Sequence, residues 1–375
     1  MAAPDGRPRA AAEKHAELLA DRAVAHPKSL GGIVVSASRS ADHLDTALSL
    51  AADLRAPVVV LASGRAVPED TAPRPAGSTD LALTLVPVPE DYRPPVVDLV
   101  TDGIPAGTAG LDDLCVKRNL GLLLARLLGW ETVLFLDDDI RGLTGVDVER
   151  ALEVLPDAGM AGMPAREFPD NSVVCHANRL TGYEQDVFVS GSMLLVDRDA
   201  MTSFFPRIYN EDWIFMAPAI LEGRVVEAGE CRQLPYDPFA DPEKAYLQEF
   251  GNVVADGLMS SLHHGSLDLA TDEDFWARFL TERGRFLRGI RQRSDQTDTR
   301  VIAALSAAER RLAEITVPEL IAYVRAWNAD RAAWRSILSA LPSVPDVGAA
   351  VAHLGLRAYP AAGALPVARE KEETP

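Results

Sequence analysis

Short apolar segments alternate with helical segments through the first half of the chain, and this alternation is the feature that most constrains the fold. Buried strands are expected at residues 33–35, 58–61, 81–88 and 133–136. A helical segment, 40–54, follows the first strand, and a leucine-rich segment, 117–128, precedes the fourth. Strands that alternate with helices favour a mostly parallel sheet with helices on both faces. We therefore expect a three-layer α/β/α, Rossmann-like fold.

The rest of the chain has a different pattern. From Glu273 onward helical periodicity dominates, and no internal repeat is visible. We expect four parts: an N-terminal helical segment (1–30), an α/β domain (31–265), a C-terminal helical extension (266–341) and a loose tail (342–375). The helical extension has three open roles: it covers a binding site, forms a homodimer surface, or only packs on the sheet.

Composition excludes several classes of function. The 375 residues are 47% hydrophobic, and no apolar run reaches the length of a membrane span. The net charge of −18 disfavours nucleic acid and anionic lipid as partners. The charged N-terminus lacks the apolar core of a secretion signal, and the three cysteines are far apart. We expect a cytoplasmic protein without an integral membrane segment.

Three consecutive aspartates follow the fourth strand. Asp137, Asp138 and Asp139 stand where a parallel sheet binds ligands, at the carboxyl end of a strand. Like charges this close raise one another's cost of ionisation, so a positive partner is expected. Carboxylates are the oxygen ligands that Mg²⁺ and Mn²⁺ prefer. The alternative is a solvated acidic turn.

Other polar residues are expected near the same edge of the sheet. Ser36, Ser38 and Arg39 follow the first strand. Lys117 and Arg118 begin the leucine-rich helix, whose N-terminus would add to the attraction for an anion. For each of the three basic residues, a solvated surface position is the alternative.

Four segments together resemble the GT-A-fold, family-2-like glycosyltransferases. These are KRNLG at 117–121, LFLDDD at 134–139, VSGS at 189–192 and NEDW at 210–213. Their order and spacing match, over roughly residues 31–240, the helix start, the Asp-x-Asp strand and the acid pair of that family. The resemblance implies a GT-A-like fold and transfer of a sugar from a nucleoside diphosphate sugar to a hydroxyl acceptor, with Mn²⁺ or Mg²⁺ as cofactor.

The resemblance also implies roles for individual acids. Asp139 would bind the metal, and Asp137 would hold the metal, the ribose or both. Asp138 is counted with the donor-binding residues, unless this middle residue faces away. Asp212 would be the general base of an inverting enzyme, with Glu211 as its close competitor. Ordinary acidity at a helix N-terminus is the alternative for this pair.

The remaining site residues rest on weaker patterns. Gly191 would let backbone approach the donor, and His264 would be a third metal ligand. The three basic residues, Arg39, Lys117 and Arg118, would contact the diphosphate. Acceptor contacts are also considered for three ring-bearing residues: His176, Trp213 and Tyr236.

The sequence departs from the family in one place. Residues 62–65, after the second strand, contain no acid to contact the nucleotide base. Two alternatives stay open. One is a degenerate GT-A-like domain that binds without turnover. The other is a nucleotidylyltransferase, which the absence of glycine from residues 36–43 disfavours. The sugar, nucleotide and acceptor are not specified.

Overall fold

A central sheet organises the molecule. The computed structural model describes residues 15–21, 28–67, 83–104, 112–166, 168, 172–183 and 187–360. The main sheet contains β1 Leu30–Ala37, β2 Val58–Ala62, β3 Leu83–Pro87, β4 Thr132–Asp137, β6 Met160–Gly162, β7 Met193–Asp197, β8 Val225–Glu227 and β10 Tyr359–Pro360. A two-stranded ribbon pairs β5 Ile140–Arg141 with β9 Arg232–Gln233.

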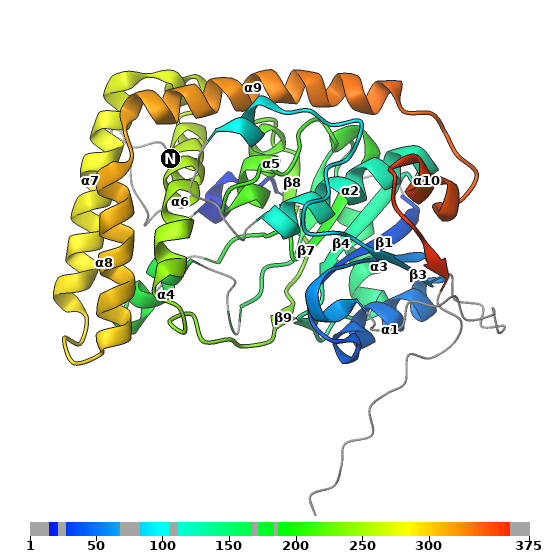
Figure 1. The fold of residues 1–375 in the computed structure, drawn as a ribbon, viewed down its shortest axis with the longest axis horizontal. Helices are drawn as coiled ribbons and strands as arrows, with labels where there is room; N and C mark the ends of the chain where they lie inside the picture. Colours follow the sequence, from blue (N-terminus) through cyan, green and yellow to red (C-terminus); the bar gives the residue numbers. More distant parts are fainter. Residues whose placement is uncertain are drawn as a thin grey trace, which may run out of the picture.

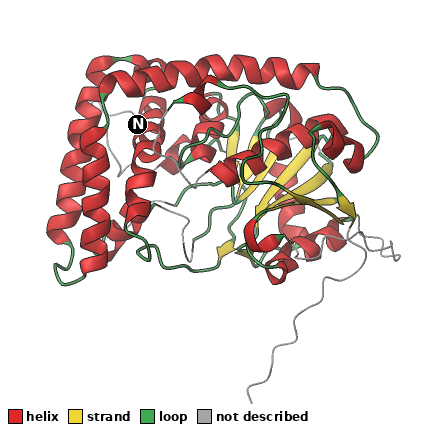
Figure 2. Cartoon of the chain, viewed as in Figure 1, coloured by secondary structure: helices red, strands yellow, loops and turns green. Residues whose placement is uncertain are grey.

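The strand order is β10-β3-β2-β1-β4-β7-β6-β8, and helices cover both faces (Figure 1, Figure 2). Strands β3, β2, β1 and β4 are parallel, whereas β7 runs antiparallel to both of its neighbours. The carboxyl end of β4 therefore lies beside the start of β7. The predicted three-layer α/β/α fold, with a helical C-terminal part, is confirmed.

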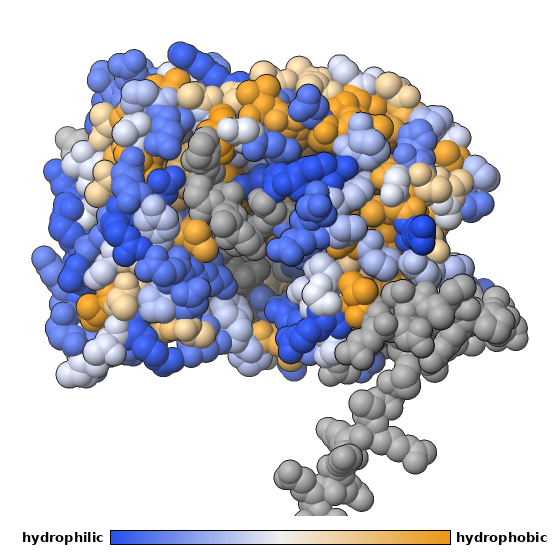
Figure 3. Space-filling model, viewed as in Figure 1, coloured by the Kyte–Doolittle hydropathy of each residue, from blue (hydrophilic) through white to orange (hydrophobic). Residues whose placement is uncertain are grey.

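The helices are α1 Asp45–Leu54, α2 Asp112–Leu128, α3 Gly145–Val154, α4 Val173–Leu180, α5 Glu211–Leu221, α6 Glu243–His263, α7 Glu273–Arg293, α8 Thr299–Glu314, α9 Val317–Ala340 and α10 Val347–His353. Among those of the described residues, none has both the length and the hydrophobicity needed to span a membrane. The side formed by α7 and α8 is mainly hydrophilic (Figure 3).

Side chains alternate between two cores along each central strand, as the pleat requires. Val34 and Phe135 face the larger core, under α2, α5 and α6, while Val35 and Leu136 face the core under α1 and α3. Because both faces are covered, the central strands are apolar throughout. This is why the sequence shows them as continuous apolar runs.

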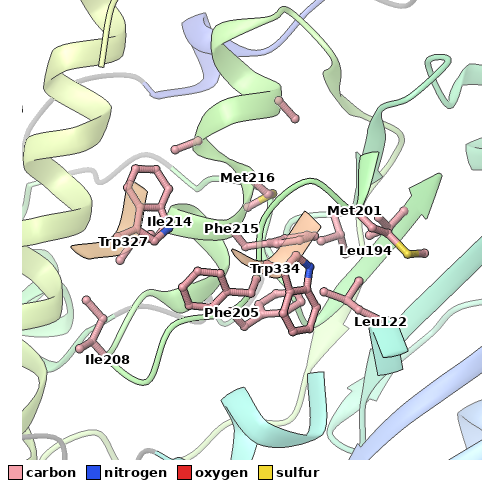
Figure 4. Packing of buried hydrophobic residues seen from close by; sticks show 14 of the residues in the cluster. Leu122, Leu194, Met201, Phe205, Ile208, Ile214, Phe215, Met216, Trp327 and Trp334 are labelled. Atoms are coloured by element: carbon pink, nitrogen blue, oxygen red, sulfur yellow. The ribbon is translucent and has the colours of Figure 1, made fainter. Parts of the chain in front are cut away.

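Helix α9, from the C-terminal helical part of the chain, covers the larger core. Its Trp327 and Trp334 are buried near residues of α5 (Figure 4). Phe205 and Phe215 stack with their ring centroids 4.1 Å apart. The helical extension therefore packs on the α/β domain and shares its core, which favours the third of its predicted roles.

A buried ion cluster joins α6 to α7. Arg283 donates to both oxygens of Glu249 at 2.8 Å and to Asp256 Oδ2 at 2.8 Å. The exposed fractions of the Arg283 and Glu249 side chains are 1% and 0%. One guanidinium therefore faces two carboxyl groups, and solvent reaches the cluster only through the Asp256 side chain, which is 13% exposed.

Three sequence predictions differ from the structure. Helix α2 begins at Asp112, five residues before the predicted start. Residues 15–21 of the predicted N-terminal helix contain one four-residue 3₁₀ turn, His15–Leu18. Residues 342–360 of the predicted loose tail form α10 and β10, and β10 pairs with β3. The rest of both termini lies outside the described residues.

Candidate active site

Three strands bring the candidate residues to one edge of the sheet. Ser36 of β1 is in register with Asp137, the last residue of β4. The Asp137 N–H donates to the Ser192 carbonyl at 2.9 Å, which adds the segment before β7. The predicted grouping of the first-strand end with the aspartates is therefore what the structure contains. Gly191 lies beside them.

Arg39 bridges two of the aspartates. Its guanidinium donates to Asp138 Oδ1 through Nη1 and to Asp139 Oδ2 through Nη2, the latter at 3.0 Å. Asp138 Oδ2 also accepts from the backbone N–H groups of Ser38 and Arg39, at 2.8 and 2.9 Å. Asp138 therefore points back to the turn after β1, and this buried carboxylate fixes that turn.

Arg118 forms the second bridge. It donates to Asp137 Oδ2 at 2.8 Å and to Glu211 Oε1. A Cβ atom on Gly191 would lie 2.6 Å from the guanidinium carbon, so only glycine fits against it. The structure thus gives Gly191 a role in arginine packing. Arg118 lies in the second turn of α2, so the predicted contribution of the helix N-terminus does not apply to it.

The predicted acid pair begins α5. Asp212 accepts from the backbone N–H of Gly191 at 2.7 Å and of Trp213 at 2.8 Å. These two bonds fix its carboxylate beside the start of β7. Burial raises the pKa of Glu211 from 4.5 to about 8, against the lowering effect of Arg118, and neighbouring Asp212 adds to the rise.

The turn before this pair is fastened to α6. Asn210 has a left-handed backbone (φ 60°), and its side chain donates to Asn252 Oδ1 at 3.1 Å. It occupies the predicted N-cap position but makes no capping bond. A Cβ on Gly251 would lie 2.2 Å from the Tyr209 carbonyl oxygen, so α6 and this turn are in close backbone contact.

Lys117 has a different environment from the one predicted. Its ammonium donates to Ala37 O, to Ser63 Oγ and to Asp113 Oδ2 at 2.7, 2.7 and 2.6 Å. An ammonium has three donors, so all are used within the protein. Burial lowers the pKa of Lys117, while Asp113 opposes that shift. Lys117 therefore fastens α2 to the ends of β1 and β2.

Two site residues were missed from the sequence. Asp113 supplies the acid that residues 62–65 lack: Ser63 Oγ donates to its Oδ2 at 2.8 Å. Gln233 donates to Asp139 Oδ2 at 3.2 Å, and its own buried Oε1 has no hydrogen-bond partner among the described residues. Gln233 reaches the site from β9, whereas Asp113 lies on α2, four residues before Lys117.

The ring-bearing candidates lie in two clusters. Trp213 packs edge-on against Phe188, with centroids 5.3 Å apart, and against His15 at 5.2 Å. His176 Nε2 is 3.3 Å from Tyr236 OH, and burial lowers its pKa to about 4. These packing contacts leave the predicted acceptor roles untested.

His264 follows the end of α6 as its C-cap. Within the described residues, no three His, Cys, Asp or Glu side chains gather into a metal-binding group. The predicted set of Asp137, Asp139 and His264 stays a prediction. Magnesium-type ions need few protein ligands, since waters and phosphates complete the shell.

The charges at this edge fit a cation. Five carboxyl groups, those of the three aspartates, Glu211 and Asp212, face the two guanidinium groups of Arg39 and Arg118. Negative charge is therefore in excess within this group of residues. The unpartnered Gln233 amide oxygen adds a hard oxygen donor beside Asp139. The donor set suits Mg²⁺ or Mn²⁺.

No protein-family model and no curated protein matches the chain. Among solved structures it is similar to the mannosyltransferase PcManGT from Pyrobaculum calidifontis in complex with GDP-Man and Mn²⁺. The identity is 18%, the TM-score is 0.42, and the match covers 85% of this chain and 89% of that one.

The chain is also similar to two structures of glucosyl-3-phosphoglycerate synthase from Mycobacterium tuberculosis with Mn²⁺ and UDP. Each is 13% identical, with TM-scores of 0.36 and 0.33. The matches cover 63% and 68% of this chain, and 78% and 80% of those chains. Such distant likenesses do not decide the function, which depends on the residues of the site.

Proposed function

We propose that the chain is a metal-dependent glycosyltransferase, which moves a hexosyl group from a nucleoside diphosphate sugar to a hydroxyl acceptor. One observation carries the proposal: an under-neutralised acidic group at the carboxyl end of β4 faces a fixed second acid, Asp212, across Gly191. Ligands of open α/β sheets bind at this edge. A donor site and a proton acceptor are thereby adjacent.

The metal would be held by Asp137 and Asp139, with the Gln233 amide oxygen as a further ligand. When bound, the ion would neutralise the diphosphate leaving group as a Lewis acid. Carboxylate and amide oxygens are the donors that Mg²⁺ and Mn²⁺ accept. His264 remains the alternative third ligand.

Asp212 would act as the base of an inverting reaction, by accepting the proton of the acceptor hydroxyl. Its carboxylate has about four lone-pair positions, and two backbone N–H bonds leave acceptor capacity for a substrate. Glu211 suits this role less, because its Oε1 is engaged by Arg118. Proton transfer of this kind contributes about 10²–10⁴-fold to a rate.

The donor's other contacts follow from position. Arg39 is the more exposed of the two site arginines and would bind the diphosphate, since a planar guanidinium matches phosphate geometry. Asp113, which lies in the first turn of α2 beside the end of β2, would contact the nucleoside. Ser36 and Ser38 border the same space.

A second candidate function is a GT-A-like binding domain without turnover. The observation in its favour is that Arg39 and Arg118 already contact four of the five carboxylates. A domain that has lost its metal would need such internal cations. The two functions differ in whether a divalent ion binds at Asp139.

Thermal unfolding against nucleoside diphosphates, with and without Mn²⁺, tests the proposal. Ligand at about 100 times its Kd stabilises the folded state by about 2.7 kcal/mol. We expect a Mn²⁺-dependent rise in the unfolding midpoint with at least one nucleotide, absent in Asp139→Ala. Asp274→Ala, at an exposed position on α7, is the control and keeps the rise. No rise with any nucleotide would favour the binding domain.

A further inference from the structure

The two site arginines differ in how firmly they are held. The Arg118 side chain is 3% exposed and is enclosed by Asp137, Glu211 and the backbone at Gly191. The Arg39 side chain is 35% exposed, and its acidic partners, Asp138 and Asp139, lie in the turn that follows β4. Withdrawal of Arg118 would leave the buried Glu211 without its cation. Withdrawal of Arg39 is less costly, because its head already contacts solvent.

Both aspartates would keep other contacts after such a withdrawal. Asp138 would keep two backbone N–H bonds, from Ser38 and Arg39, at 2.8 and 2.9 Å. Asp139 would keep the bond from Gln233 Nε2 at 3.2 Å. These contacts would hold the two aspartates in place, so the Arg39 side chain can leave without disruption of the turn.

Arg39 also contacts the carboxylate that would bind the metal. Its Nη2 is 3.0 Å from Asp139 Oδ2. A divalent cation bound to that carboxylate would lie close to the guanidinium, and like charges repel strongly where water is partly excluded. Metal and Arg39 therefore compete for Asp139. A diphosphate removes the competition, because it offers Arg39 a bidentate anion.

We propose that Arg39 is a resident counter-cation, which occupies Asp139 until a diphosphate draws it away, so that divalent-metal binding and diphosphate binding are coupled. This inference rests on the proposed function and deepens it. Metal alone would bind weakly, and the nucleotide alone would bind weakly. Each would strengthen the other by the same factor, as linkage requires.

Titration of the full chain with Mn²⁺, followed by the electron paramagnetic resonance signal of the free ion, tests the coupling. GDP and UDP are the probes, each compared with no nucleotide. For wild type we expect nucleotide to tighten Mn²⁺ binding by about tenfold or more. For Arg39→Gln we expect tighter Mn²⁺ binding than wild type without nucleotide, and a smaller coupling, because only the direct contact between ion and diphosphate then remains.

Arg141→Gln is the matched control. Arg141 lies two residues beyond Asp139, and it contacts backbone carbonyls and His43 Nδ1. The substitution removes one positive charge near the site without uncovering an acid. We expect its Mn²⁺ binding to follow wild type. A second variant, Arg39→Lys, keeps the charge but loses the two-pronged bridge, and we expect an intermediate coupling.

The outcomes separate the two proposals. Equal Mn²⁺ affinity of wild type and Arg39→Gln without nucleotide would overturn the counter-cation and leave the glycosyltransferase standing. If Arg39→Gln and Arg141→Gln bind Mn²⁺ more tightly than wild type by the same factor without nucleotide, the counter-cation is also overturned. Net charge alone would then explain the gain. If no form of the chain binds Mn²⁺ with either nucleotide, both proposals fail.

Discussion

Two buried groups of charges in this molecule have opposite designs. On α6 and α7, Arg283 meets Glu249 and Asp256, and hardly any of the cluster contacts solvent. At the end of β4, five carboxyl groups face Arg39 and Arg118, and Arg39 is partly exposed. The first cluster is closed and stabilises a helix pair. Acids outnumber cations in both clusters, but solvent reaches the cation Arg39 of the second, and a binding site requires such access.

Removal of the cation from the closed cluster should have the largest effect. Arg283→Met would remove the cation from the buried Glu249 and the partly buried Asp256, which costs about 3–5 kcal/mol. Urea unfolding measures the loss. Arg300→Met is the control, because the Arg300–Asp237 ion pair is exposed and such pairs contribute about 0–1 kcal/mol. Equal losses in the two variants would contradict the distinction between closed and open clusters.

In the open cluster, loss of an acid should affect turnover and leave folding intact. Asp212→Asn should lower the transfer rate by about 10²–10⁴-fold. Mn²⁺-dependent nucleotide binding should persist, since the hydrogen bonds of Asp212 within the described residues come from the backbone N–H groups of Gly191 and Trp213. Transfer rates are measured with sugar derivatives of the nucleoside diphosphate that binds in the thermal unfolding experiment. A larger rate loss in Glu211→Gln would transfer the base role to Glu211.

Gly191→Ala tests how tightly the backbone at Gly191 packs against the Arg118 side chain. A Cβ placed 2.6 Å from the Arg118 guanidinium carbon forces a displacement, and overpacking of this kind costs about 1–3 kcal/mol. Gly103→Ala is the control, because its Cβ would meet no atom within 4 Å. Thermal unfolding compares them. If both variants unfold with wild type, Arg118 is less firmly held than its contacts indicate.

The smallest effect concerns pH. Burial raises the pKa of Asp256 from 3.8 to about 6, and that of Glu211 from 4.5 to about 8. A carboxyl group with a higher pKa in the folded state binds more protons when folded, so stability falls as pH rises between its unfolded and folded pKa. Ionisation of Asp256 therefore lowers the stability as pH rises to about 6, and ionisation of Glu211 lowers it as pH rises to about 8.

Unfolding free energies measured across this range separate the clusters. Asp256→Asn should flatten the decline below about pH 6, and Glu211→Gln should flatten it between about pH 6 and 8. If wild type and Glu211→Gln have the same slope above pH 6, Arg118 keeps that carboxyl group ionised throughout.

Local periodicity allowed much of this fold to be predicted. Strand β4 and the three aspartates at its end were visible because a buried strand is a continuous apolar run with an abrupt polar end. Their proximity to the end of β1 followed from parallel topology. Strand β10 was missed, because two residues, Tyr359 and Pro360, carry no periodic signal.

The contacts that define the site were harder to predict. Arg39 was identified as a binder of diphosphate, yet its partner acids lie about a hundred residues along the chain. Gln233 reaches the site only through tertiary packing, and Asp113, one helical turn before Lys117, stands outside the predicted motif. Lys117 lies in the predicted motif, but its ammonium joins α2 to the ends of β1 and β2. Residue type indicates chemistry, whereas the partner is decided by the fold.

The contact between α6 and the turn at Asn210 has a practical consequence for anyone who wishes to shorten or transplant this chain. The bond from Asn210 leads through Asn252 to Glu249, whose cation, Arg283, comes from α7. A fragment cut at residue 265 would carry every candidate catalytic acid and leave Arg283 behind. The smallest unit that keeps the contacts of this turn therefore includes Arg283, and extends well past residue 240, where the resemblance to glycosyltransferases ends.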